Sequence, residues 1–268
     1  MNDVPGICHA PGRSESPKPR FSVVVPALFE AASICRTLDA VRAAALRAGV
    51  RVEVVVADGD PEGSTLAALA QCGADGEARG DGGFTLRGLG APRGRALQMN
   101  AGASAACGEI LVFLHADTLL PEEAFSAVEE ALARGARAGA FALDIDSKRP
   151  SLRLVAAVAT LRGRLFGLPY GDQACFLRRE DFARLGGFAE LPLMEDVEFA
   201  RRLSRAGMRP RILPCAVLTS ARRWERQGAL WCTLRNWLLV ALYSLGVPPA
   251  RLARFYGAMG GNTGEKRS

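Results

Sequence analysis

Three short runs of apolar, mostly β-branched residues constrain the fold of this chain more than any other feature. Longer segments rich in alanine and leucine separate them. Continuous apolar runs are typical of parallel strands covered on both faces, and their alternation with helical segments predicts an α/β fold. The three expected strands are FSVVVP (21–26), VEVVVAD (52–58) and EILVFLHAD (109–117). The expected helices flanking this mostly parallel central sheet are 30–48, 62–72, 95–107 and 121–134.

The second half of the chain has a less regular pattern. The glycine-rich segment 72–95 predicts a loop with a short edge strand at 84–86. Further on, the expected strands are 138–145, 173–178 and 209–214, and the expected helices are 151–166 and 192–207.

Composition sets the domain organisation. With 49% hydrophobic and 23% charged residues, 268 residues suffice for a globular domain with a large core. The N-terminal residues are rich in Pro, Ser and Gly and lack the apolar run of a secretory signal. We expect a disordered tail (1–20), one domain (21–215), a C-terminal helical segment (216–258) and a second tail (259–268).

The seven cysteines are scattered singly along the chain. No CxxC or Cys/His cluster is present, so neither a disulfide framework nor a structural zinc site is expected. This pattern favours the reducing cytoplasm.

The segment 199–226 is rich in arginine: it contains eight arginines and one acidic residue, Glu225. Such a stretch suits an anionic partner, namely a diphosphate, an anionic membrane surface or nucleic acid. A solvated basic face explains it equally well. Nucleic acid is the least favoured partner, because aromatic interleaving is limited to Trp224.

Residues 229–247 form an apolar run with one charge, Arg235. As a helix the run would be about 28 Å long, close to the thickness of a bilayer. Arg235 and Asn236 would be costly in hydrocarbon. We therefore favour a helix that packs on the domain, or that lies peripherally on the inner face of the membrane, over one that spans it.

Polar or turn-forming residues end each of the first three strands: Pro26, Asp58 and Asp117. Ligand sites of open α/β sheets lie at this edge. Asp117 could hold a hard divalent cation, Mg²⁺ or Mn²⁺, that neutralises a diphosphate, and Asp58 could accept hydrogen bonds from a base or ribose. Either residue could instead be a turn former or helix cap. His115 would point to the same face as Asp117 and could contact metal or phosphate, or be structural.

Two further groups begin predicted helices. Glu195 and Asp196 are favoured there by the helix dipole alone, although a carboxylate in a pocket can also act as a base. Arg93 and Arg95 could hold phosphate at a helix N-terminus. No Walker or GxGxxG spacing is present, which disfavours P-loop and dinucleotide sites.

Five blocks of the sequence, taken in order and spacing, resemble family 2 of the nucleotide-sugar glycosyltransferases, which have the GT-A fold. The resemblance covers about residues 21–215. The blocks are FSVVVPALFEAASI, VEVVVADGD, GRALQMNAGASAACGEILVFLHADTLLP, PYGDQACFLRREDFARLGGF and LMEDVEFARRL. The chain looks most like the subgroup associated with arsenosugar biosynthesis, whose hallmarks include SARRWE (220–225) and extend the resemblance to about Tyr256.

The resemblance implies roles for individual residues. Asp196 matches the catalytic base, with Glu195 beside it, and Asp117 matches the second acid of the metal-binding DxD motif, whose first acid is His115 here. The residues that match nucleotide-sugar contacts are Pro26, Ala27, Glu30, Asp58, Arg95, Asn100, His115, Ala116 and Asp117. Those that match contacts to the acceptor or diphosphate are Gly171, Asp172, Gln173, Arg222, Arg223 and Trp224.

The function we expect is therefore inverting transfer of a sugar from a nucleoside-diphosphate donor, UDP-type favoured, to a hydroxyl of a small or lipid-like acceptor. One alternative is a nucleotidyltransferase, although PALFEAAS lacks the Gly-rich loop and basic residue that usually follow its first strand. Another is a non-catalytic membrane-surface or scaffold protein.

Overall fold

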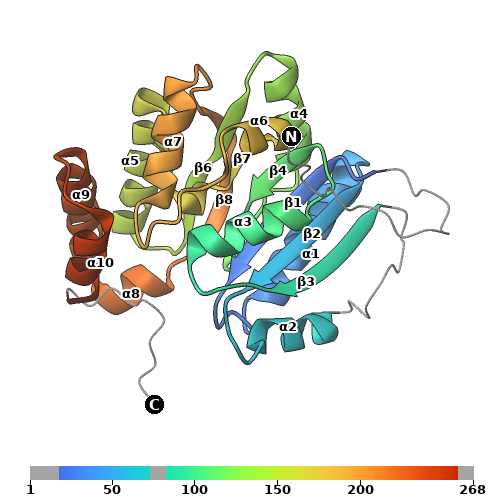
Figure 1. The fold of residues 1–268 in the computed structure, drawn as a ribbon, viewed down its shortest axis with the longest axis horizontal. Helices are drawn as coiled ribbons and strands as arrows, with labels where there is room; N and C mark the ends of the chain where they lie inside the picture. The colour runs from blue at the N-terminus through green and yellow to red at the C-terminus, as the bar shows by residue number, and fades with distance from the viewer. Residues whose placement is uncertain (1–17, 73–82, 259–268) are drawn as a thin grey trace, which may run out of the picture.

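The computed structural model describes residues 18–72 and 83–258. An eight-stranded sheet runs through it in the order β3-β2-β1-β4-β7-β6-β8-β5 (Figure 1). The first four strands in that order are parallel to one another. They are β1 (Phe21–Ala27), β2 (Val52–Asp58), β3 (Phe84–Gly90) and β4 (Ile110–Phe113).

The other half of the sheet is mixed. Strand β7 runs antiparallel to β4 and β6, β6 is parallel to β8, and β5 is antiparallel to β8. The strands are β5 (Thr118–Leu119), β6 (Ala138–Asp146), β7 (Cys175–Arg178) and β8 (Arg211–Ser220). The expected mostly parallel sheet flanked by helices is confirmed.

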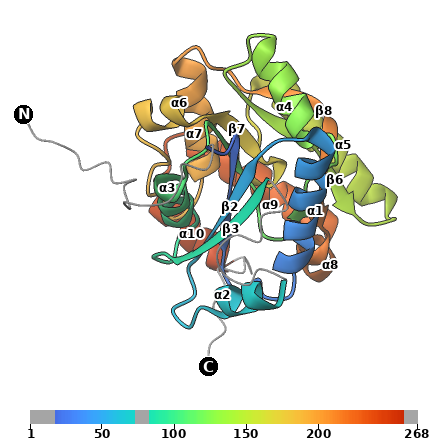
Figure 2. The ribbon, with the colours of Figure 1, turned by 90° about the vertical axis from the view of Figure 1, so that its right-hand side faces the viewer.

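Alternation of side chains along β1 explains why helices cover both faces of the sheet. Val23 and Val25 belong to one core cluster, which includes buried residues of helix α1 (Ile34–Ala48). Val24, between them, belongs to a second cluster with residues of α3 (Arg95–Ala105). Because successive strand residues point to opposite faces, an all-valine run needs a cover on each side. Figure 2 shows α1 and α3 on opposite sides of the sheet.

The remaining helices complete the two layers and the C-terminal part. Short 3₁₀ turns, η1 (Ala70–Cys72) and η2 (Gly171–Gln173), accompany them. The helices are α2 (Ser64–Leu69), α4 (Ala124–Ala133), α5 (Pro150–Phe166), α6 (Arg179–Arg184), α7 (Glu195–Arg205), α8 (Arg222–Gln227), α9 (Ala229–Ser244) and α10 (Pro249–Ala258).

Several boundaries differ from those predicted. Strand β4 ends at Phe113 instead of 117, because the Thr118 N–H donates to His115 O and turns the chain. Strand β8 continues to Ser220, past the expected domain boundary at 215. The expected edge strand is confirmed as β3. The predicted tails lie largely outside the described residues, as do residues 73–82 of the expected loop.

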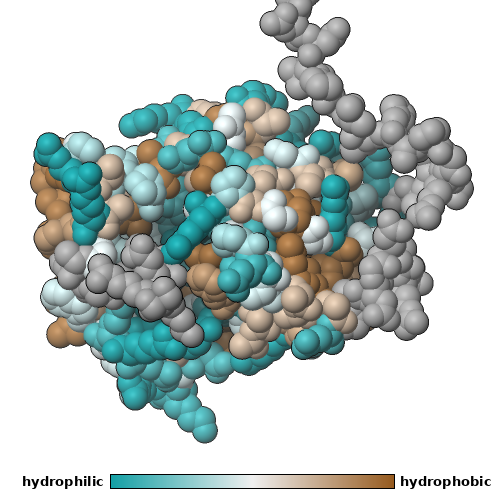
Figure 3. All heavy atoms as spheres, turned by 60° about the horizontal axis from the view of Figure 1, so that its bottom comes forward, coloured by the Kyte–Doolittle hydropathy of each residue, from teal (hydrophilic) through white to brown (hydrophobic). Residues whose placement is uncertain are grey.

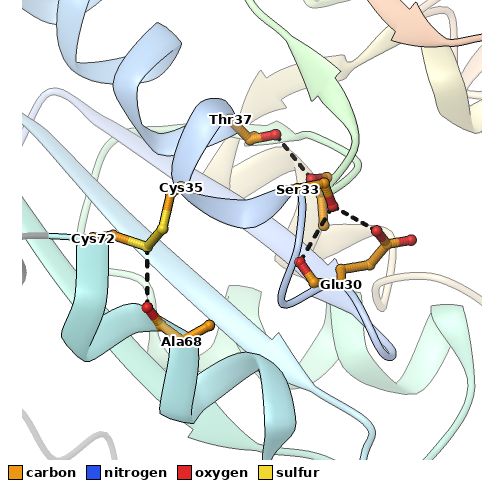
Figure 4. The surroundings of a disulfide bond; sticks show 7 residues. Glu30, Ser33, Cys35, Thr37, Ala68 and Cys72 are labelled. Carbon is orange, nitrogen blue, oxygen red and sulfur yellow. Dashed lines mark hydrogen bonds between the residues drawn. A yellow bond between two sulfur atoms is a disulfide. The ribbon is translucent and has the colours of Figure 1, made fainter.

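A disulfide joins Cys35 of α1 to Cys72 at the end of η1 (Figure 4). The prediction that the cysteines form no disulfide was therefore wrong for this pair, and the argument for a reducing compartment loses that support. The two cysteines are 37 residues apart in the sequence, and their spacing does not reveal the pairing. They meet because α1 and α2 pack side by side. No second disulfide occurs within 18–72 and 83–258.

The apolar run 229–247 becomes α9, of 16 residues. At 1.5 Å per residue this helix is about 24 Å long, shorter than the hydrocarbon core of a bilayer. Within the parts of the chain that the structure describes, no helix combines the length and apolarity needed to cross a membrane.

Candidate active site

A cleft of about 490 Å³ lies at the carboxyl ends of β1 and β4. The N-terminal ends of α3 and α7 border it, and side chains from α8, α9 and α10 line it further. Its volume falls within the range of small-molecule sites. Its charged lining residues are Glu30, Arg93, Arg95, Asp117, Asp172, Glu195, Asp196 and Arg223.

The loop after β1 presents Glu30 to the cleft. Its carboxylate accepts a hydrogen bond from Ser33 Oγ (2.6 Å, Figure 4), and its backbone N–H donates to Thr65 Oγ1 (3.2 Å). Arg222 Nη2 donates both to Glu30 Oε2 (2.9 Å) and to Asp117 Oδ2 (3.1 Å). One guanidinium thus bridges two carboxylates from different strand ends.

Asp117 is held there by the backbone on the β8 side. The Ser220 N–H donates to Asp117 O (3.1 Å), next to the pairing of Thr118 with Thr219. Strand β8 and the start of α8 therefore stand directly against the loop that carries Asp117. This connection explains how Arg222, far away in the sequence, reaches it.

His115 lies deeper in the same wall. Its Nε2 atom is buried and has no hydrogen-bond partner. Burial, together with the nearby Arg95 charge, lowers the pKa of His115 from 6.5 to about 3, so the ring is neutral. Gly171 lies opposite it, and a β-carbon there would be 3.0 Å from both His115 Nε2 and Arg95 Nη1, so a side chain would crowd both groups.

Helix α7 brings Glu195 and Asp196 to the cleft. Glu195 is 3% exposed, and its Oε1 lies 3.1 Å from Arg95 Nε. Burial raises the pKa of Glu195, and Arg95 opposes that shift. Asp196 accepts two backbone hydrogen bonds, from Gly171 N–H (2.8 Å) and Val197 N–H (2.7 Å).

Asp172 is a third acid near this helix start. Burial raises its pKa, against the pull of Arg223 and Arg162, and its Oδ1 has no hydrogen-bond partner. A buried carboxyl with a raised pKa is suited to holding a proton or to accepting a hydrogen bond from a bound ligand.

Backbone strain gathers around the cleft. Within the described residues, the non-glycine residues with positive φ are Phe29 (59°), Ala174 (46°) and Met194 (70°). Phe29 lies between two residues that line the cleft, Met194 lines it, and Ala174 follows the lining residue Asp172 by two positions. Such conformations cost about 1–3 kcal/mol and collect at functional sites. At Met194 the turn starts α7 so that both acids lie at the cleft.

The family model for glycosyl transferase family 2 matches residues 22–182. The chain belongs to glycosyl transferase family 2. The match ends before Glu195, so it does not cover the pair of acids on α7. No curated protein sequence matches the chain.

Solved structures of glycosyltransferases share the fold. A mannosyltransferase from Pyrobaculum calidifontis, in complex with GDP-Man and Mn²⁺, is 22% identical, with a TM-score of 0.58 and coverage of 92% of this chain and 70% of that one. Glucosyl-3-phosphoglycerate synthase from Mycobacterium tuberculosis, in complex with Mn²⁺, UDP and glucosyl-3-phosphoglycerate, is 19% identical, with a TM-score of 0.54 and coverage of 86% and 81%. These likenesses show the GT-A fold.

Most of the residues expected at the glycosyltransferase site line the cleft. Asp117 and Asp196 converge there as anticipated. The full set is Pro26, Ala27, Glu30, Arg95, His115, Ala116, Asp117, Gly171, Asp172, Glu195, Asp196 and Arg223.

Asp58 is the main exception. It is 1% exposed and absent from the described lining, and its carboxylate accepts backbone N–H groups of Asp60, Thr65 and Leu66 (3.0–3.2 Å). The alternative weighed for it, a turn former and cap of the following helix, describes the geometry. Asp58 does not line this cleft, and its contact with a nucleotide stays a prediction.

Four other expected residues also serve the fold. Asn100 exchanges two hydrogen bonds with the Phe188 backbone (2.9 Å each), and buried Gln173 bonds to Phe141 O (3.0 Å) and Tyr170 N–H (3.1 Å). Trp224 packs in the core at 7% exposure. Arg222 lies outside the described lining but touches it through its two carboxylates.

Sequence reasoning missed the apolar end of the cleft. Leu193 and Met194 line it with Leu239 and Val240 of α9, and Tyr256 of α10 adds a hydroxyl. Their own sequence pattern indicates only helices, because amphipathic spacing does not say which neighbour an apolar face will meet.

A divalent cation fits the donor set only with help from a ligand. Asp117 offers a carboxylate, and neutral His115 offers an Nε2 without a partner. Among the described residues, no three His, Cys, Asp or Glu side chains gather closely enough to form a metal site by themselves. Mg²⁺ and Mn²⁺ accept such a site when phosphate oxygens and water complete their shell.

Proposed function

We propose that this protein transfers a sugar from a nucleoside-diphosphate donor, UDP-type favoured, to a hydroxyl of a small or lipid-like acceptor, with inversion at the anomeric carbon. The observation that carries the proposal is the shared cleft. It holds Arg93, Arg95 and Arg223 together with the Asp196 carboxylate. The arginines suit a diphosphate, and the carboxylate suits a proton.

Asp196 is the proposed base. Its two backbone hydrogen bonds fix the carboxylate, and ionised oxygens keep further lone pairs for the acceptor hydroxyl. The acceptor oxygen forms a bond to the anomeric carbon while the bond from that carbon to the diphosphate oxygen breaks. Asp196 takes the hydroxyl proton, and the electron pair leaves with the diphosphate.

Arg93, Arg95 and Arg223 would stabilise the departing diphosphate, because fixed positive groups in a partly closed cleft act where negative charge develops. Glu195 holds Arg95 in place through their ion pair. When bound, a divalent cation on Asp117, with His115 beside it, would neutralise part of the same charge.

The apolar end of the cleft favours an acceptor with an apolar part. Leu193, Leu239 and Val240 line this end, beyond Asp196. Membership in the arsenosugar-associated subgroup stays a prediction. The proposal includes a cytoplasmic location with contact between residues 229–247 and the inner face of a membrane, since α9 has exposed leucines and tryptophans.

A thermal-shift panel of UDP-, GDP- and dTDP-sugars, each with and without Mn²⁺, tests the donor. A ligand that binds only the folded state raises the melting temperature. At a concentration one hundred times its Kd, it adds about 2.7 kcal/mol to the free energy of unfolding. We expect one nucleotide sugar to give a shift that grows with Mn²⁺. A scaffold protein predicts no shift with any of them, and a nucleotidyltransferase predicts the larger shift with a nucleoside triphosphate.

A further inference from the structure

An exposed apolar stripe runs along α9. Its spacing repeats every three to four residues, which places its members on one side of the helix. The large side chains on that side are between 45% and 73% exposed: Leu230, Trp231, Leu234, Trp237 and Leu238. Arg235, the charge within this helix, is 1% exposed and donates inward to Gln227 Oε1 (2.9 Å). The outward side of α9 therefore carries no charge.

Helix α5 contacts α9 (Figure 1). It carries a second group of exposed apolar side chains. Leu154, Leu161, Leu165 and Phe166 are 54–65% exposed on it. We call the stripe and this group together the α5/α9 face. Figure 3 shows apolar atoms gathered at the end of the molecule where α9 and α10 lie. Apolar surface of this extent marks a contact site.

The charges on α5 and on the segment 226–258 have one sign. Neither α5 nor the segment 226–258 contains an acidic residue. The exposed charged residues on these segments are Arg153, Arg164, Arg226, Arg251 and Arg254. A second copy would place arginine against arginine, whereas anionic lipid headgroups complement this rim. The two tryptophans suit the same setting, because Trp is enriched at membrane–water boundaries.

The opposite side of α9 belongs to the cleft, which Asn236, Leu239 and Val240 line. One helix diameter, about 10–12 Å, thus separates the cleft from the exposed stripe.

We propose that the α5/α9 face docks on an anionic bilayer surface, with Trp231 and Trp237 in the headgroup region. This docking rests on the membrane contact that the proposed function includes for residues 229–247, and it adds α5 and the charge of the lipid. It needs neither donor nor acceptor. It also gives α5 a part that the sequence does not suggest.

Co-sedimentation with vesicles tests the docking on the full chain. One set contains phosphatidylcholine and phosphatidylglycerol, and the other phosphatidylcholine alone. We expect binding to the first set only. Leu234→Glu and Leu161→Glu should each weaken it at least about tenfold, the loss expected when a buried leucine contact is replaced by a charge. The matched control is Leu46→Glu, on α1, where Leu46 is 63% exposed and binding should stay at the wild-type level.

Three results would overturn the docking: equal binding to neutral vesicles, wild-type binding by Leu234→Glu, or a dimer in light scattering that Leu234→Glu dissociates. Wild-type binding by Leu161→Glu would overturn the part given to α5. The donor-dependent thermal shift, measured on the same variants, reports folding and the proposed function separately. Lost docking by these variants with a retained shift supports this inference. A wild-type chain that gives the shift but binds neither vesicle set also overturns the docking and leaves the transferase proposal standing.

Discussion

Replacing Asp196 by asparagine tests the proposed base with little change in shape. The carboxylate accepts one hydrogen bond on each oxygen, from Gly171 and Val197. An amide offers one acceptor oxygen, so one of the two N–H groups then meets an NH₂ group. The side chain is partly exposed and water can relieve this mismatch, so we expect a stability loss of about 1–2 kcal/mol.

The effect on turnover should be much larger. An asparagine cannot take the proton of the acceptor hydroxyl, and general-base catalysis contributes about 10²–10⁴-fold. The expected loss corresponds to a barrier about 3–5 kcal/mol higher. The assay is release of nucleoside diphosphate from the donor found by thermal shift, with the donor-dependent shift itself as the measure of binding.

Glu198→Gln is the matched control, since Glu198 lies on the same helix and pairs with Arg202 (2.7 Å) instead of facing the cleft. It should keep turnover within about threefold of wild type, because a partly exposed helical ion pair contributes little. If Asp196→Asn turns over within about tenfold of wild type while folded and donor-bound, Asp196 is not the base.

Three further predictions follow from single contacts. Arg222→Gln frees the carboxylates of Glu30 and Asp117. The affinity for Mn²⁺, measured by titration calorimetry without donor, should therefore rise about two- to fivefold. An unchanged affinity would show that the arginine bridge does not compete with metal. Burial raises the pKa of Asp172, so above pH 3.8 the folded state keeps a proton that the unfolded chain has lost. The free energy of unfolding therefore falls as the pH rises through that range. In urea unfolding from pH 4 to 7, the free energy of Asp172→Asn should change less with pH than that of the wild type, and parallel profiles would contradict this. Cys35→Ser should lower the stability of the oxidised protein by about 2–4 kcal/mol in urea unfolding, with no further loss on adding dithiothreitol.

Short-range patterns gave the elements and the edge of the sheet that holds the site. Local rules place Pro26 near the end of β1, Asp117 shortly after β4 and Glu195 at the start of α7, and the structure has them there. The family resemblance added roles that these rules left open. The local rules succeeded for residues whose position depends mainly on the strand or helix that carries them, and the roles that the resemblance implies stay predictions.

Sequence reasoning did not reveal hydrogen bonds between distant segments. Asn100 and Gln173 bond to the backbone of Phe188 and Phe141, whereas the backbone partners of Asp58 lie two to eight residues along the chain. No spacing in the sequence reveals the partners of Asn100 and Gln173, whereas local turn chemistry accounts for those of Asp58.

By itself, then, the sequence determined an alternating α/β domain, its parallel strands and the chain positions of the acids on their ends, because these depend on hydrophobic periodicity and local turn chemistry. Tertiary structure alone decided which acids share the cleft, that Arg222 bridges two of them, that Cys35 meets Cys72, and that the single charge of α9 turns inward. Each of these is a contact between distant segments, set by how the layers pack.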